Sequence, residues 1–336
     1  RSPEMAYPIG TAFGIKCYPS IADAVKQEQP DAAVISTSPL SHDAIIRECL
    51  QNNLHVFTEI NLVPDGYAEN LALAKEKGKV LFLSSTFLYR KETQTIIEKV
   101  HQADCPLNYI YHIGQYLPDW HPWESYNNYF IGDKRTNGCR EIMAIDLPWI
   151  VTAFGPIKNA IAVKSKNTEL NISYNDNYLI TLEHEGGYKG VLAVDVVTRK
   201  SIRHIDVYGE KFQMSWNGTA DSLTEYDVEA KVENKIEFEH LIRPLGYILR
   251  IDSASLLANQ VCQRHEQRSC SGRRVKDFHS SQVGVIAHQQ TRYDSSDRMR
   301  CVILGILTTR IGIIVFDKVF KDSSKEIIML LERLFK

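Results

Sequence analysis

Five residues that could contact a ligand lie just beyond two short apolar segments of the sequence. They are Thr37, Ser38, Pro39, His42 and Glu59. The apolar segments, residues 31–36 and 54–58, have the length and composition of buried strands in a parallel sheet. In such sheets a ligand binds outside the carboxyl ends of the strands. We therefore expect these five residues to line a binding site.

The residues between the two segments predict the helix that joins them. Ser41 is a candidate N-cap, and apolar residues recur at helical spacing from Ala44 to Leu50. Together the three elements form one βαβ unit with a right-handed crossover. Similar signals predict helices at residues 20–29, 67–77 and 91–102 and another buried strand at residues 79–84.

The alternation of strand and helix signals stops at Cys105-Pro106, where we place a domain boundary. Strand-like runs occur at residues 107–115, 159–164, 169–174, 178–184, 190–198, 204–208 and 211–216, with turn signals between them. Residues 139–154 have helical spacing and should cover one face of the resulting sheet. The predicted fold class is α/β plus α+β. Residues 1–105 form a partial Rossmann-like parallel sheet, and residues 106–336 form an open antiparallel sheet covered by helices.

The overall composition argues against several classes of protein. The chain has 39 basic and 41 acidic residues, so a nucleic-acid or anionic-membrane partner is not expected. No apolar run reaches the length of a transmembrane helix. The seven cysteines show neither CxxC spacing nor pairing, which predicts a reducing, cytoplasmic setting.

Residues 259–300 differ from the rest of the chain. Seven Arg and one Lys occur between residues 261 and 300, and apolar periodicity is weak there. The segment is either a solvated or disordered insertion or a stretch outside the original reading frame. It also contains Cys262, His265, Cys270 and His279, whose spacing fits no zinc pattern, so no metal site is predicted.

A second group of candidate residues lies in the string Asp119-Trp120-His121-Pro122-Trp123-Glu124. Aromatic rings stack on the C–H faces of sugars, and carboxylates accept hydrogen bonds from sugar hydroxyls. Asp119, Trp120 and Trp123 are therefore candidate substrate-binding residues, and His121 is a candidate catalytic base. An equally good interpretation is an aromatic loop that packs on the sheet.

Several strings resemble, in order and spacing, one family of oxidoreductases. They are Tyr18-Pro-Ser-Ile-Ala-Asp23, Asp31-Ala-Ala-Val-Ile-Ser-Thr-Ser-Pro39, Ser41-His42, His55-Val-Phe-Thr-Glu59, Gly114-Gln-Tyr-Leu-Pro-Asp-Trp120 and residues 141–155. The family is that of glucose–fructose oxidoreductase, inositol dehydrogenase and rhizopine catabolism (Gfo/Idh/MocA). The resemblance implies a two-domain NAD- or NADP-dependent oxidoreductase that acts on a hydroxyl of a sugar, cyclitol or nucleotide sugar. It also implies a homo-oligomer formed through the antiparallel sheet.

The resemblance assigns roles to particular residues. Thr37, Ser38, Pro39 and His42 match strand ends that bind the cofactor, and Glu59 matches a position near a cofactor ribose. Glu141 takes the place of an acidic residue on the family's catalytic helix.

Three departures from the family pattern are visible. No GxGxxG string occurs, so residues 1–105 resemble an incomplete nucleotide-binding domain that should bind NAD(P) weakly. Ile60 replaces the family's lysine and Ile145 its general-base histidine, and neither side chain can exchange a proton. Two hypotheses follow. One is an enzyme that uses Glu141 and His121, and the other is a non-catalytic relative that binds a sugar-like ligand or a partner.

Overall fold

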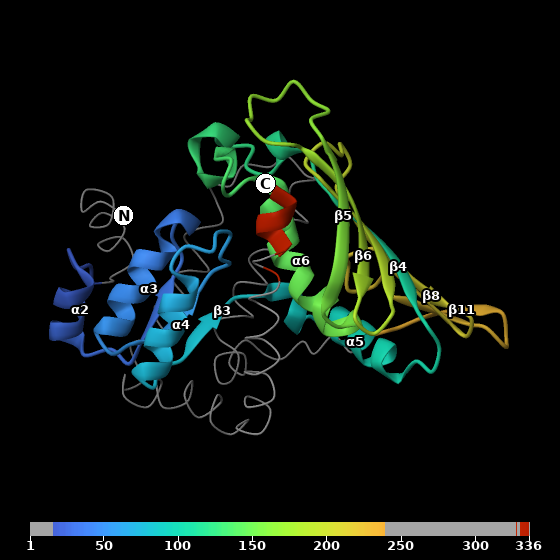
Figure 1. The fold of residues 1–336 in the computed structure, drawn as a ribbon, viewed down its shortest axis with the longest axis horizontal. Coiled ribbons are helices and arrows are strands. Elements are labelled where there is room, and N and C mark those ends of the chain that lie inside the picture. Colours follow the sequence, from blue (N-terminus) through green and yellow to red (C-terminus); the bar gives the residue numbers. More distant parts are fainter. Residues whose placement is uncertain (1–15, 239–326, 328–329, 336) are drawn as a thin grey trace, which may run out of the picture.

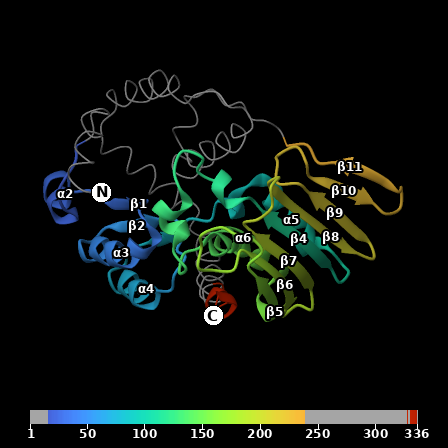
Figure 2. The same ribbon diagram turned by 90° about the horizontal axis from the view of Figure 1, so that it is seen from above.

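The computed structural model describes residues 16–238, 327 and 330–335, which form a small parallel sheet and a large mixed sheet (Figure 1). The small sheet comes first in the chain, and the helix α6 lies between it and the large sheet in Figures 1 and 2. The elements of the first part are α2 (Ile21–Glu28), β1 (Ala32–Ile35), η1 (Pro39–Ser41), α3 (His42–Gln51), β2 (His55–Thr58), α4 (Tyr67–Glu76), β3 (Leu81–Leu83), η2 (Thr86–Tyr89) and α5 (Lys91–Gln102).

The remaining described elements belong to the large sheet and its covering layer. They are β4 (Asn108–Gly114), η3 (Leu117–Asp119), η4 (Tyr126–Asn128), η5 (Phe130–Gly132), α6 (Gly138–Phe154), β5 (Ile157–Ser165), β6 (Asn177–His184), β7 (Lys189–Asp195), β8 (Ile202–Gly209), β9 (Phe212–Trp216), β10 (Thr224–Asp227) and β11 (Val232–Lys235). Residues 330–335 are also helical.

The predicted βαβ unit is confirmed. β1, α3 and β2 follow one another, and the two strands pair in parallel with β3 beside them, in the order β1-β2-β3. Ile46, Leu50 and Val56 form a buried core between the sheet and α3. Because parallel strands end at the same edge, Thr37 and Glu59 are brought to one side of the sheet.

The expectation that residues 31–36 are buried on both faces is wrong. Val34 is 68 % exposed, and β1 pairs only with β2 among the described strands. Its neighbours in register, Phe57 and Phe82, are half-buried and stack on each other. Within the described part of the chain only the α3 side of this sheet has a full apolar layer, which is why Val34 stays exposed.

The predicted antiparallel sheet covered by helices is confirmed, with one parallel pair of strands that was not predicted. Its order is β11-β10-β9-β8-β4-β7-β6-β5, and β4 and β7 pair in parallel while the other neighbours are antiparallel. Figure 2 shows α5 and α6 against one face, as predicted for residues 139–154. α6 is buried over most of its surface because it packs between this sheet and the first part of the chain.

Two predictions about strands are wrong. Residues 169–174 form turns instead of a strand, and β10 and β11 were not anticipated. The alternation in residues 169–174 has another cause, because Tyr174 is buried and donates a hydrogen bond to Ile131 O. The predictions for residues 259–300, including Cys262 and His279, lie outside the described residues.

Candidate functional site

The turn after β1 is held by hydroxyl groups. The Thr37 and Ser41 hydroxyl oxygens lie 2.9 Å apart, and the Ser41 hydroxyl donates to Ser38 O at 2.7 Å. Ser41 occupies the N-cap position of α3, as predicted, but its side chain makes no cap hydrogen bond because it is used in this turn. Thr37 and Ser38 remain exposed, whereas Pro39 is buried at the start of η1.

His42 lies in the interior at the first position of α3. It is 1 % exposed, its Nε2 lies 3.1 Å from Thr37 O, and its Nδ1 lies 2.7 Å from the Asn61 side-chain oxygen. These contacts join the loop after β1 to the loop after β2. His42 therefore holds the two loops together at the strand ends, and both of its ring nitrogens already have partners.

Two carboxyl groups come together although they are far apart in the sequence. Glu59 follows β2, and Glu141 lies in the first turn of α6. Burial, followed by the negative charge of Glu59, raises the pKa of Glu141 from 4.5 to about 7. A half-buried carboxyl of this kind exchanges its proton near neutral pH, which is the property that acid–base chemistry requires.

The aromatic loop extends toward the same carboxyl. The His121 ring stacks between Trp123 and Tyr129, with ring centroids 4.9 and 4.5 Å away, and its Nδ1 lies 2.9 Å from Glu124 Oε1. Burial, followed by the charges of Glu141 and Glu124, raises the pKa of Tyr129. The His121 stack and Glu141 thus belong to one neighbourhood.

The three predicted substrate-binding residues separate into different environments. Trp123 is 65 % exposed and Asp119 is also exposed, so both are accessible. Trp120 packs against the core and donates a hydrogen bond to Gln115 O at 3.1 Å. A Cβ atom at Gly138 would lie only 3.3 Å from its ring, so the glycine allows the close packing. Trp120 therefore fits the interpretation as packing, whereas Trp123 presents a ring face to the solvent side of the stack.

Ile60 and Ile145, which the resemblance aligns with the family's lysine and histidine, are partly buried and pack against the main core cluster. Glu141 and Ile145 are one helical turn apart on α6, so they share a face of the helix. Ile60 directly follows Glu59. Each of these two apolar side chains therefore lies close in the sequence to a carboxyl group of the site, Ile60 to Glu59 and Ile145 to Glu141.

The residues present fit only part of a dinucleotide. The exposed Thr37 and Ser38 hydroxyls and the Glu59 carboxylate suit the hydroxyl groups of a ribose. The pyrophosphate needs closely spaced glycines at the start of a helix. In residues 16–85 the structure contains only Gly66, the N-cap of α4, and Gly78, which follows α4, so no two glycines are close together at the start of a helix.

Two residues of the site were missed in the sequence. Tyr129 and Arg140 carry no motif, and their partners come from distant segments. A basic side chain in the first turn of a helix interacts unfavourably with the helix dipole, and this exception at Arg140 could have marked it in the sequence.

Among the described side chains no group of three or more His, Cys, Asp or Glu residues is arranged to hold a metal ion. No described helix combines the length and apolarity needed to cross a membrane.

Comparisons with known proteins agree with this geometry. Residues 1–85 match the family model of an oxidoreductase family with an NAD-binding Rossmann fold. No curated protein matches the sequence. Three similar solved structures illustrate the fold.

The first of these structures is UDP-N-acetylglucosamine 3-dehydrogenase GnnA from Acidithiobacillus ferrooxidans, at 16 % identity and a TM-score of 0.55 over 70 % of this chain and 72 % of that one. The WlbA dehydrogenase from Bordetella pertussis in complex with NADH and UDP-GlcNAcA matches at 19 % identity and a TM-score of 0.59, over 66 % and 69 % of the two chains. Aldose-aldose oxidoreductase from Caulobacter crescentus complexed with glycerol matches at 14 % identity and a TM-score of 0.58, over 70 % and 72 %.

Proposed function

Since residues 1–85 match the Gfo/Idh/MocA family model, we propose that the chain is an NAD- or NADP-dependent oxidoreductase of this family that acts on a hydroxyl of a sugar, cyclitol or nucleotide sugar. The observation that carries the proposal is the Glu141 carboxyl, whose pKa is raised to about 7 beside Glu59. It lies where the ends of the parallel strands face the first turn of α6. Solved proteins of the same fold act on or bind such compounds.

In this proposal the cofactor supplies the hydride acceptor or donor. Thr37, Ser38 and Glu59 bind its hydroxyl groups, with Pro39 and His42 shaping the turn beneath them. Asp119 and Trp123 contact the sugar-like substrate. Glu141 accepts the hydroxyl proton from a position one turn before Ile145, where the family has its histidine.

The test is the rate of NAD(P)H formation with a panel of sugars and nucleotide sugars. Glu141→Gln keeps the size of the side chain and removes the proton acceptor. We expect kcat to fall on the order of a hundred-fold or more. The matched control is Glu76→Gln, an exposed carboxyl on α4. Unchanged turnover in Glu141→Gln would exclude this role, and His121→Ala would then be the next variant to measure.

A second candidate function is a sugar-binding protein without turnover. The observation that favours it is the packing of Ile60 and Ile145 into the apolar core. Calorimetry with the same panel separates the two functions. Binding that is lost in Trp123→Ala, together with no NAD(P)H formation under any condition, would support the binding protein.

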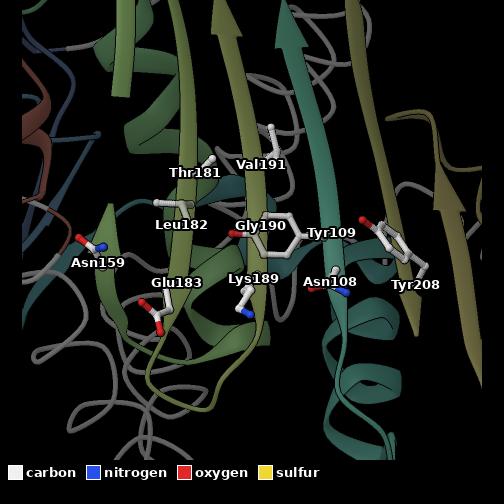
Figure 3. A pocket seen from close by; sticks show the side chains of 10 residues that line it. All are labelled: Asn108, Tyr109, Asn159, Thr181, Leu182, Glu183, Lys189, Gly190, Val191 and Tyr208. Atoms are coloured by element: carbon white, nitrogen blue, oxygen red, sulfur yellow. The ribbon is translucent and has the colours of Figure 1, made fainter. Parts of the chain in front are cut away.

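We also propose that two copies of the chain associate through the outer face of the large sheet. Among the described residues twelve large apolar side chains are exposed, and six lie on this one face: Ile110, Ile161, Val163, Leu179, Val191 and Tyr208. Figure 3 shows Val191 and Tyr208 among the residues that line a pocket on this sheet, together with Gly190. An apolar surface of this extent is typical of an interface.

Several polar side chains on the same face are already paired with one another. His112 Nε2 lies 2.7 Å from Asp195, His204 Nε2 lies 2.8 Å from Asp206, and Lys158 pairs with Glu183. Because these polar groups already have partners, a second copy could cover the apolar side chains of this face without leaving them unpaired.

Light scattering tests the association. Val191→Glu should shift the chain toward the monomer, whereas Val232→Glu, at the far edge on β11, should not. A wild-type monomer at high concentration would refute the association. Cys49, Cys105 and Cys139 carry free thiols, and this supports the proposal of a reducing, cytoplasmic setting.

A further inference from the structure

Arg140 is a buried cation at a position where the helix itself disfavours it. It is the third residue of α6, near the positive end of the helix dipole, and it is 5 % exposed. A buried guanidinium is destabilising unless most of its hydrogen-bond donors have acceptors. Its contacts therefore indicate what it does in this fold.

The guanidinium joins three segments that are distant in the sequence. Nη1 donates to Leu62 O at 2.9 Å and to Glu332 Oε1 at 2.9 Å, and Nη2 donates to Leu331 O at 3.4 Å. The group also lies over the Phe335 ring, 4.8 Å from its centroid. Arg140 thus connects the loop after β2, the first turn of α6 and the helical residues 330–335.

Two of these segments carry the carboxyl groups of the candidate site. Leu62 is three residues after Glu59, and Arg140 precedes Glu141 directly. The hydrogen bond from Arg140 to Leu62 O is therefore a short mechanical link between the backbones that hold the two carboxyls.

We propose that Arg140 is a positioning residue that holds the Glu59 loop against the first turn of α6, with residues 331–335 as the third anchor. The inference rests on the proposed function only in taking Glu59 and Glu141 as the working pair. It adds a role for the C-terminal residues, which complete the site through Arg140 without contacting a ligand themselves.

Positioning and simple charge make opposite predictions. If Arg140 acted on Glu141 only as a nearby positive charge, its removal would raise the pKa of Glu141. If Arg140 holds the loop, its removal lets Glu59 move away and water enter, and both effects lower that pKa toward 4.5. The direction of the change therefore identifies the role.

The experiment is a titration of Glu141 by carbon-13 NMR of glutamate-labelled protein, with the signal assigned from Glu141→Gln. The whole chain is used, and no turnover is needed. In Arg140→Met we expect the midpoint to fall by about half a pH unit or more from about 7. Arg140→Lys keeps the charge but lacks the planar fork that reaches several acceptors, so we expect a smaller fall.

Arg135→Met is the matched control. Arg135 also links the two parts of the chain, because its Nη2 donates to both carboxylate oxygens of Asp65 at 2.7 and 2.8 Å, but that pair is exposed. Exposed pairs contribute little, so the Glu141 midpoint should not change.

An unchanged or raised midpoint in a folded Arg140→Met chain would overturn the proposal. If Arg140→Met does not fold, Arg140→Lys decides, and a midpoint equal to that of the wild type would then reject the inference. A chain that titrates as expected but turns over no sugar would contradict the proposed function and leave this inference standing. Normal turnover with an unchanged Glu141 midpoint in both Arg140 variants would contradict this inference and leave the proposed function standing.

Discussion

The stability of the chain should depend on pH through Glu141. Its pKa is about 7 in the folded chain, against 4.5 for an ordinary solvated glutamate, which represents the unfolded chain. The folded state therefore keeps a proton that the unfolded state has lost between these two pH values. The contribution is most favourable below pH 4.5, and it declines as the pH rises until it levels off above about pH 7.

The size of the effect follows from the two pKa values. At about 1.4 kcal/mol per pH unit, their difference corresponds to about 3 kcal/mol of unfolding free energy. Glu141→Gln cannot ionise, so this variant should lack that decline. Relative to the wild type it should gain about 3 kcal/mol as the pH rises from 4.5 to about 7.

Urea denaturation of both chains at intervals of half a pH unit measures the difference. Other carboxyl groups titrate in the same range, so the quantity to follow is the free energy of Glu141→Gln minus that of the wild type. Glu76→Gln provides the control for an exposed carboxyl. Parallel curves for Glu141→Gln and the wild type across this pH range would refute the reasoning about burial and the Glu59 charge.

Three further outcomes follow from the core of the large sheet. Asp146→Asn should lower the free energy of unfolding by about 3 kcal/mol in urea denaturation, because it weakens the buried ion pair with Arg203, in which Nη1 and Oδ1 lie 2.5 Å apart. Adding Arg203→Met to this variant should recover part of the loss. Gly190→Ala should lower stability by about 1–3 kcal/mol in thermal melts, because the added methyl group would overlap the Tyr109 ring. Cys139 should resist a thiol reagent in the native chain and react after unfolding, since burial raises its pKa; rapid native labelling would contradict this.

Local sequence patterns were sufficient for the elements that bear the site. The helix expected at residues 91–102 is α5 with the same bounds, and the helix expected at residues 139–154 begins one residue earlier. Helical spacing and turn residues act within a few positions, so they can be read without knowing the partners. The strands that end before Thr37 and Glu59 were predicted for the same reason.

The arrangement of the strands in the large sheet was harder to predict from the sequence. The parallel pairing of β4 with β7 joins residues about 80 positions apart, and nothing local distinguishes a parallel neighbour from an antiparallel one. β10 and β11 have exposed or half-buried side chains and little apolar alternation, so their pattern did not mark them as strands.

The sequence by itself determined which residue types stand at the strand ends and at the start of α6, because those positions follow from local hydrogen bonding and spacing. Only the tertiary structure decided what they do. It buried His42 between two loops, brought Glu59 close enough to raise the pKa of Glu141, and used Arg140 to link both to the C-terminal residues. These properties depend on burial and on charges from distant segments, and both exist only once the chain has packed.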